Sequence, residues 1–271
     1  MLLSAARNYE RRSILSITLL NDVTSFGVLH TPRLSPPYPL VIILHGLASN
    51  KMGTKRSYIY LAEELAKIGI ATLRVDLPGH GDSEYHLLDF SLEDYKTSVW
   101  EIISYAFSQS YTDTENVAIF GSSLGGTLAL LNIAAFPKVK SLALWAPTIL
   151  GALWLQETLS QPKSEVTTKD EEVLYAGVPI NKTFCSQFID LQALQEAHLF
   201  SPALSILYMQ GQQDSLVSLQ HQKLFQEAFI NKSNPVDIRT YPNVDHTFAC
   251  TNTSVFSDLI QWLQCELTPQ D

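Results

Sequence analysis

Residues 116–126 read Asn116-Val117-Ala118-Ile119-Phe120-Gly121-Ser122-Ser123-Leu124-Gly125-Gly126. The apolar residues before Gly121 are typical of a buried strand, and the pattern after Ser123 is typical of a helix as far as Phe136. A sharp strand-to-helix turn strains the backbone of its central residue, and flanking glycines let the neighbouring chain pass without a Cβ clash. Such a turn lifts the Ser123 hydroxyl above a helix N-terminus, where partial positive charge favours an oxyanion. We therefore interpret Ser123 as a nucleophile rather than as part of a structural turn.

Short apolar runs alternate with longer helical patterns over most of the chain. This alternation predicts βαβ crossovers and a mostly parallel central sheet with helices on both faces, preceded by an antiparallel hairpin. In such sheets ligands bind beyond the carboxyl ends of the strands. The expected strands are Arg12–Leu20, Thr24–His30, Leu40–Leu44, Ile70–Val75, Val117–Phe120, Ser141–Trp145, Ser205–Met209 and Val236–Tyr241. The expected helices are Ser57–Ile68, Leu92–Phe107, Leu124–Phe136, Leu219–Ile230 and Val255–Leu267.

The segment 148–200 interrupts this alternation because it contains no long buried strand. It is too long for an ordinary connection and is expected to be an inserted cap with its own small structure. We therefore divide the chain into an α/β core formed by residues 1–147 and 201–271 and a cap formed by residues 148–200. The cap is expected to hold, in order, an amphipathic piece at Ile149–Leu159, a polar stretch at Ser160–Asp170, a hairpin around Leu174–Phe184 and a helix around Phe188–Ala197.

Composition excludes several kinds of partner. The chain has 271 residues, of which 46% are hydrophobic, and carries a net charge of −9. Binding of nucleic acid needs clustered Lys and Arg to neutralise phosphates, so no nucleic-acid partner is expected. No run approaches the ~18 apolar residues of a membrane span, and none is expected. We expect a monomer or a homodimer that acts on a small molecule.

Cysteine usage indicates the compartment. The three cysteines, Cys185, Cys250 and Cys265, are odd in number and lack metal-ligand spacing, which favours free thiols in a reducing cytosol. The first residues, from Met1 to Arg7, lack the apolar core of a secretory signal. The sequence therefore predicts a cytoplasmic protein.

A serine hydroxyl becomes a strong nucleophile when a base removes its proton and a third group orients that base. Asp214 and His246 are the candidates, because each follows a predicted strand and both come after the serine. Asp245 and Asp237 are rival acids, but Asp245 is adjacent to His246, and consecutive side chains in an extended loop tend to point apart. Asp214 has an alternative role in a surface turn or as a cap for the helix that starts near Ser218.

Acyl transfer also needs N–H donors for the developing oxyanion, worth roughly 2.7–4 kcal/mol each. The N–H of Leu124 follows the nucleophile, and a second donor is expected from Leu47, in the loop after the strand Leu40–Leu44. Gly46 lets this loop approach closely, and His45 is expected to hold it in place rather than to react.

The turn Asp76-Leu77-Pro78-Gly79-His80-Gly81-Asp82-Ser83 looks at first like a phosphate loop. It lacks the lysine of a P-loop and the glycine spacing of a dinucleotide fingerprint, so a tight turn is the better interpretation. His80, His86 and Asp82 make a weak metal-binding pattern. We expect no metal here.

Taken together, the chain resembles an α/β-hydrolase fold serine hydrolase. This resemblance implies a catalytic triad of Ser123, His246 and Asp214, an oxyanion hole at Leu47 and Leu124, and no cofactor. The motifs that carry it are His45-Gly46, Asp76-Leu77-Pro78-Gly79-His80-Gly81-Asp82-Ser83, Gly121-Ser122-Ser123-Leu124-Gly125-Gly126, Gly211-Gln212-Gln213-Asp214 and Asp245-His246.

Within this fold, the chain is most similar to cap-bearing cinnamoyl and feruloyl esterase-like enzymes and to the serine aminopeptidase and monoacylglycerol lipase group. The cap portion from Tyr175 to Ile180, leading into Phe184, resembles the small insertion of the cinnamoyl esterases. Ser122 departs from the pattern, since His or Gln often precedes the nucleophile.

Our hypothesis is a serine esterase that cleaves small acyl or aryl carboxylic esters. Trp154, Leu153, Leu155 and Phe184 form either the wall of an apolar substrate pocket or the core of the cap. The same triad also allows a thioesterase, an acyltransferase or a short-peptide peptidase. A non-catalytic binding protein is the alternative from another class, and the loss of a triad member would be its sign. Acidic cap residues that could bind a peptide amine are Glu157, Glu165, Asp170, Glu171 and Glu172.

Overall fold

A single large sheet organises the chain. The computed structural model describes residues 9–20, 22–159, 166–169, 172–175, 177–247 and 253–268. The strands of the large sheet are β1 (Glu10–Leu19), β2 (Val23–Pro32), β3 (Tyr38–Leu44), β4 (Ala71–Val75), β5 (Thr112–Ser122), β6 (Val139–Trp145), β10 (Ser205–Gly211) and β11 (Val236–Tyr241). Over the described residues they lie in the order β1-β2-β4-β3-β5-β6-β10-β11. β2 is antiparallel to both neighbours, and the strands from β4 to β11 in this order are parallel.

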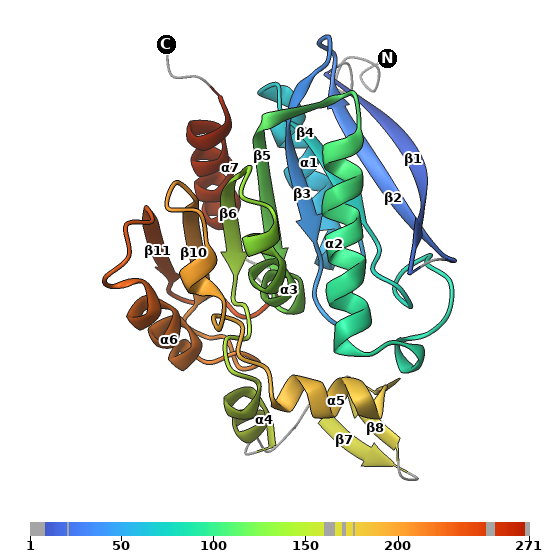
Figure 1. Cartoon of the computed structure of the whole chain (residues 1–271), viewed down its shortest axis with the longest axis vertical. Helices are drawn as coiled ribbons and strands as arrows, with labels where there is room; N and C mark the ends of the chain where they lie inside the picture. The colour runs from blue at the N-terminus through green and yellow to red at the C-terminus, as the bar shows by residue number, and fades with distance from the viewer. Residues whose placement is uncertain are drawn as a thin grey trace.

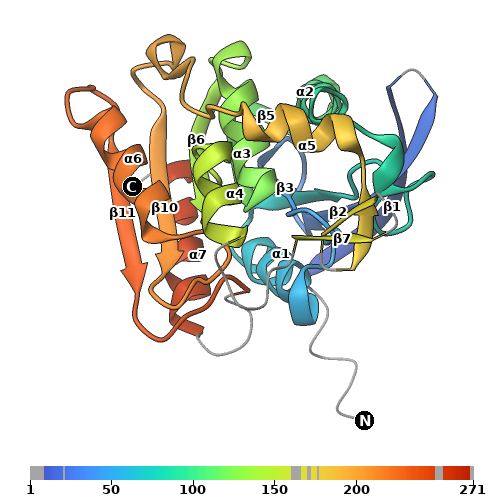
Figure 2. The ribbon, with the colours of Figure 1, turned by 90° about the horizontal axis from the view of Figure 1, so that it is seen from below.

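Helices cover both faces of this sheet, because alternate strand residues belong to two different hydrophobic cores. Leu40 and Ile42 of β3 lie in one core, and Val41 and Ile43 lie in the other. The helices are α1 (Ser57–Lys67), α2 (Leu92–Ser108), α3 (Leu124–Asn132), α6 (Leu219–Phe229) and α7 (Thr253–Leu267). Short 3₁₀ helices are η1 (Thr54–Arg56), η2 (Leu87–Asp89), η3 (Ile133–Ala135) and η4 (Ala197–Leu199). Figure 2 shows α1 and α7 on one side of the sheet and α2 and α3 on the other.

The segment that we interpret as a cap lies beyond the end of the large sheet. Its described residues form α4 (Gly151–Leu159), α5 (Lys182–Ile189) and a small antiparallel sheet of β7 (Val166–Lys169), β8 (Glu172–Tyr175) and β9 (Val178–Ile180). In Figure 1 the parallel strands point towards this segment, so their carboxyl ends face it. The boundaries at residues 148 and 200 stay a prediction.

The alternation of strands and helices predicted from the sequence is confirmed, but one helix of the cap was placed wrongly. The expected helix Phe188–Ala197 is absent from its predicted position, and α5 ends at Ile189 instead. Asn181 determines where α5 begins, because its side-chain oxygen accepts the N–H groups of Thr183 at 2.8 Å and Phe184 at 3.1 Å. The expected hairpin is present, but it ends at Ile180, one residue before Asn181, the N-cap of α5.

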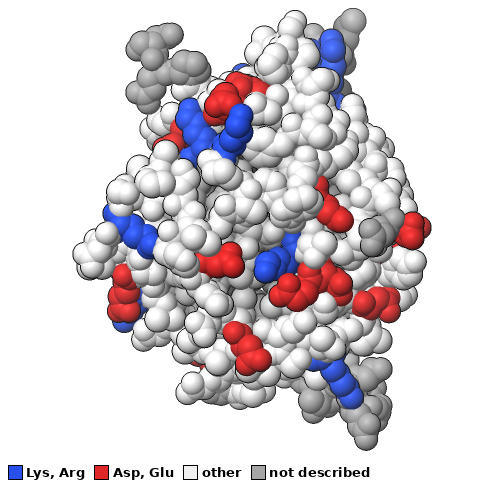
Figure 3. Space-filling view, in the orientation of Figure 1, with Lys and Arg blue, Asp and Glu red and all other residues white. Residues whose placement is uncertain are grey.

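Charged side chains of both signs are interspersed over the face shown in Figure 3, without a continuous basic surface among its described residues. Within the part of the chain that the structure describes, no helix is both long enough and apolar enough to cross a bilayer. Of the cysteines, Cys185 and Cys265 are free thiols, and Cys250 lies outside the described residues.

Gly151 makes the seating of α4 against α5 sensitive to a single methyl group. A Cβ at this position would lie 1.6 Å from the carbonyl oxygen of Phe188. Helix propensity favours alanine over glycine by about 1 kcal/mol, but overpacking costs about 1–3 kcal/mol and more when backbone must move. We expect Gly151→Ala to lower the thermal unfolding temperature. The matched control is Ala152→Ser at the adjacent, exposed position, and equal unfolding temperatures for the two variants would contradict the close contact.

Candidate functional site

Ser123 occupies a strained turn between β5 and α3. Its backbone angles are φ 51° and ψ −121°, a region that residues with a Cβ rarely adopt. Its N–H donates to the carbonyl of Trp145, at the end of β6, at 2.8 Å. A Cβ on Gly125 would lie 2.2 Å from the carbonyl oxygen of Leu44, and one on Gly121 would lie 2.5 Å from Gly126 Cα. The glycines are therefore required by close backbone approach, as predicted from the sequence.

His246 is bonded to Asp214 across the ends of β10 and β11. His246 Nδ1 lies 2.8 Å from Asp214 Oδ2, and the Asp214 side chain is only 1% exposed. The second oxygen, Oδ1, accepts the N–H groups of Leu216 and Val217, each at 2.9 Å. The carboxylate thus holds the imidazole with Nδ1 as the donor, which leaves Nε2 for a reacting group.

The rival acids have other partners. Asp245 is exposed and accepts the N–H and hydroxyl of Thr247 at 2.9 and 2.8 Å. Asp237 forms an ion pair with Arg239 at 2.6 Å. The structure therefore brings Asp214, and neither rival, to the ring of His246.

Trp145 links the serine turn to the histidine loop. Its carbonyl accepts the N–H of Ser123, and its indole Nε1 donates to the carbonyl of His246 at 2.9 Å. Trp145 itself is fully buried, so the link is made from within the core. Sequence reasoning assigned no role to Trp145, because a tryptophan at the end of a buried strand is typical of core packing.

The loop after β3 lies directly against Ser123. A Cβ on Gly46 would lie 3.2 Å from Ser123 Cβ, so a side chain here would crowd the serine. Within the described residues, the N–H groups of Leu47 and Leu124 donate to no other protein group. Both residues line a cavity together with Ser123, and their role as oxyanion donors stays a prediction.

Two buried histidines hold this loop. His45 donates from Nδ1 to the carbonyl of Gly46 at 2.8 Å and accepts the N–H of Leu77 at Nε2 at 2.9 Å. His80 accepts the N–H of Ala48 at 3.2 Å, and its other ring nitrogen lies 2.9 Å from the carbonyl of Pro78. Burial lowers the pKa of His45 to about 4 and that of His80 to about 3. His45 therefore has the supporting role predicted for it, and His80 has a similar one instead of the weak metal-binding role.

Two cavities meet at Ser123. The first is here called the apolar cavity. It is lined by Leu47, Ser123, Leu124, Thr148, Trp154, Leu155, Val166, Val173, Tyr175, Ile180, Phe184, Cys185, Phe188, Ile189 and Leu216. The second, here called the hydroxyl-lined cavity, is lined by Gly46, Leu47, Ala48, Ser49, Thr54, Ser57, Tyr58, Ser122, Ser123, Tyr175, Leu216, His246 and Thr247.

Three of the four predicted pocket residues line the apolar cavity, and one does not. Trp154 and Phe184 line the apolar cavity, as does Leu155. Leu153 is not among the described residues that line either cavity, because its neighbours on α4 take that face. Sequence reasoning missed the hydroxyl-lined cavity, since its Ser and Thr residues come from separate loops and share no motif. The Ser122 side chain there is hydrogen-bonded to the hydroxyl of Tyr58.

Comparison with known families identifies the fold. Residues 39–179, more than half of the chain, match the family model of the alpha/beta hydrolase fold, and the chain belongs to this family. Residues 192–260 also match the model of the dienelactone hydrolase family. These matches confirm the resemblance and the fold class predicted from the sequence.

Individual relatives are more distant. The chain is 35% identical over 120 residues to the quorum-quenching protein AidA of Acinetobacter baumannii, which covers 42% of this chain and 37% of that protein. It is 22% identical over 266 residues to the acylamino-acid-releasing enzyme of Mus musculus, covering 91% of this chain and 34% of that enzyme. These matches thus span about a third of the length of either relative.

Among solved structures, Est1E from Butyrivibrio proteoclasticus with bound ferulic acid superimposes with a TM-score of 0.76. The match covers 93% of this chain and 98% of that chain, at 20% sequence identity. At this identity the likeness shows a shared fold.

The strain at Ser123 predicts an unusual stability order. Glycine adopts the backbone angles of Ser123 without a Cβ clash, whereas alanine does not. We therefore expect Ser123→Gly to be more stable than Ser123→Ala by about 1 kcal/mol, the lower end of the cost of such strain. Denaturant unfolding of the two variants measures this difference. A lower stability of the glycine variant would show that the turn is not strained.

The two loop histidines predict a loss of stability in acid. Between the pKa of about 6.5 in the unfolded chain and the lowered values of about 4 and 3, only the unfolded chain binds these protons. The free energy of unfolding should therefore fall as the pH is lowered through this range. His80→Gln removes one such proton. The free energy of unfolding of this variant should therefore decrease less steeply than that of the natural protein, by about 1.4 kcal/mol per pH unit.

Urea denaturation between pH 7 and pH 5 tests this. His86→Gln, at an exposed position, is the control and should retain the slope of the natural protein. Parallel curves for His80→Gln and the natural protein would refute the role assigned to His80.

Proposed function

We propose that the protein is a serine hydrolase that cleaves carboxylic esters through an acyl-enzyme. The observation that carries this proposal is the strained Ser123 beside a cavity that His246, hydrogen-bonded to Asp214, also lines. A serine in this backbone conformation and a histidine with one nitrogen held by a buried carboxylate are the parts that nucleophilic acyl transfer requires.

In the proposed reaction, His246 Nε2 removes the hydroxyl proton as Ser123 Oγ attacks the ester carbonyl. Asp214 holds the ring in the tautomer with Nδ1 protonated and stabilises the imidazolium that forms. The N–H groups of Leu47 and Leu124 stabilise the oxyanion of the tetrahedral intermediate. His246 then protonates the departing alcohol, and a water molecule, deprotonated by the same ring, releases the acyl group from the serine.

The two cavities suggest how the ester is oriented. The leaving oxygen must lie next to His246, which lines the hydroxyl-lined cavity and is not among the described residues around the apolar cavity. The alcohol therefore occupies the hydroxyl-lined cavity, and the acyl or aryl group occupies the apolar cavity beside Trp154 and Phe184. Among the described residues that line the two cavities there is no Asp, Glu, Lys or Arg, which favours uncharged esters.

A second candidate is a peptidase that acts on acylated peptides. The match to the acylamino-acid-releasing enzyme over 91% of this chain favours it. Acylation removes the ammonium charge of a peptide, so such a substrate would suit cavities without carboxylates. Glu157, considered above as an amine-binding residue, is bonded to Ser218 instead.

We also propose a cytoplasmic location, on the basis of the free thiols.

Labelling with a fluorophosphonate and hydrolysis of 4-nitrophenyl esters test the triad. We expect the probe to modify Ser123, as mapped by mass spectrometry, and Ser123→Ala and His246→Ala to abolish both reactions. Asp214→Asn should lower kcat by about 10²–10⁴-fold, because it leaves the ring in the wrong tautomer.

Asp245→Asn is the matched control, since Asp245 precedes His246 and makes no contact with its ring in the hydrogen bonds of the described residues. It should keep the activity of the natural protein. Cleavage of acylated peptides at a higher kcat/KM than esters would favour the second candidate. A folded protein whose Ser123 is not labelled would refute both.

A further inference from the structure

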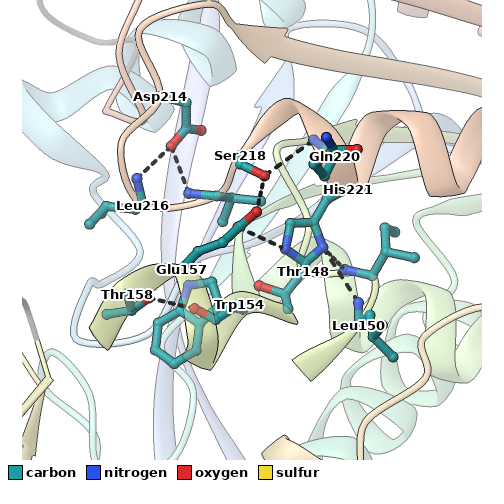
Figure 4. Close-up of polar contacts among 12 residues, drawn as sticks. Thr148, Leu150, Trp154, Glu157, Thr158, Asp214, Leu216, Ser218, Gln220 and His221 are labelled. Atoms are coloured by element: carbon teal, nitrogen blue, oxygen red, sulfur yellow. Dashed lines mark hydrogen bonds and ion pairs between the residues drawn. The ribbon is translucent and has the colours of Figure 1, made fainter. Parts of the chain in front are cut away.

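A polar cluster connects the cap to the loop that carries Asp214. Glu157 of α4 accepts a hydrogen bond from the hydroxyl of Ser218 at 2.5 Å, and its other carboxylate oxygen lies 3.7 Å from Nε2 of His221. Ser218 is the N-cap of α6, and His221 lies in the first turn of that helix. Figure 4 shows the three side chains meeting between the two helices. We call this cluster, Glu157, Ser218 and His221, the α4–α6 tie.

His221 adds a second point of attachment. Its ring is fully buried, and Nδ1 accepts the N–H groups of Ile149 at 3.0 Å and Leu150 at 3.4 Å, just before α4 begins. With Nδ1 as acceptor, the neutral ring carries its proton on Nε2, the atom that faces Glu157. Burial lowers the pKa of His221 to about 4, which supports the neutral form. The carboxylate of Glu157 thus favours the tautomer that binds the two amides.

The helix held in this way forms one wall of the apolar cavity. Trp154 lies one turn before Glu157 on α4 and lines the cavity beside Ser123. It also packs against Phe188 with a ring-centroid distance of 5.2 Å and against Tyr175 at 6.1 Å. Because Trp154 and Glu157 share a short helix, a shift of α4 on α6 would move the indole within the cavity.

The tie also lies close to the candidate acid. The chain from Asp214 to Ser218 is one short segment, in which Asp214 binds the N–H groups of Leu216 and Val217. Leu216 lines both cavities. The wall of the apolar cavity is therefore attached at the start of α6, directly after the loop that carries Asp214, as Figure 4 shows.

We propose that Glu157 is a positioning residue that sets the preference of the enzyme for large apolar acyl groups, by fixing α4 and Trp154 against α6. This inference rests on the proposed ester hydrolysis. Glu157 touches neither cavity in the described structure, so it acts through Trp154 rather than on the substrate. A small acyl group does not reach the cap wall, and its cleavage should be independent of the tie.

The test compares 4-nitrophenyl acetate with 4-nitrophenyl octanoate. We expect Glu157→Ala to raise KM for the octanoate about fivefold, the scale of one lost hydrogen bond, with kcat and the acetate reaction close to those of the natural protein. Glu157→Gln keeps an acceptor for Ser218 and should recover most of the octanoate KM. The matched control is Gln156→Ala, an exposed position on the same helix that should change neither substrate.

Hydrogen exchange supplies a readout that does not depend on ester cleavage. Amides of residues 149–159 should exchange faster in Glu157→Ala than in Gln156→Ala, because the tie holds the start and the end of this segment. If the natural protein cleaves no ester, the proposed function fails while exchange still tests the tie. Equal exchange in the two variants, or an equal loss of activity on acetate and octanoate, would overturn the proposal.

Discussion

The hydrogen bond between the Ser123 N–H and the Trp145 carbonyl fixes the backbone on which the rest of the site depends. It connects the end of β5 to the end of β6 at Ser123, whose angles, φ 51° and ψ −121°, are unfavourable for a residue with a side chain. Strain of this kind persists only where the surroundings determine the conformation. Here the surroundings are the parallel strands and the glycine contacts that leave no space for another path. The packed core thus keeps Ser123 in a strained backbone conformation that an isolated turn would not keep.

Neutral histidines hold the loops around this serine in place through hydrogen bonds. His45, His80 and His221 are each buried, and each accepts at least one backbone N–H from a neighbouring loop. A ring with one acceptor and one donor nitrogen can join two backbone segments that have no regular partner. His246 differs from these three, because its Nδ1 faces a carboxylate and its side chain is 13% exposed. Histidine therefore appears in this site in two settings. Three rings bind backbone groups of neighbouring loops, and the ring of His246 binds the carboxylate of Asp214.

The sequence predicted the core better than the cap. Buried parallel strands are continuous apolar runs, so their places along the chain and the position of residues just beyond them, such as Asp214 and His246, could be derived from pattern alone. In the cap the apolar residues Phe184, Phe188 and Leu191 keep a helical spacing across the true end of α5, so periodicity could not locate that helix. Its start depends on the side chain of Asn181, a capping signal that was present in the sequence and overlooked. The hydroxyl-lined cavity had no such signal, because tertiary contacts alone assemble it.

Trp145 has a consequence for how such a protein can change its substrates. The turn of Ser123 and the loop of His246, proposed above as nucleophile and base, are attached through this one residue to the end of β6, inside the sheet, whereas the cap wall is attached at the start of α6. Ser123 and His246 thus share a support that the cap wall lacks, whereas Asp214 lies in the loop before α6, next to the attachment of the cap wall. Substitutions, insertions and repacking in the cap can alter what is admitted without changing the spacing of the reacting groups. A chain built in this way can acquire a new substrate range through changes in its cap segment, while the sheet preserves the reaction.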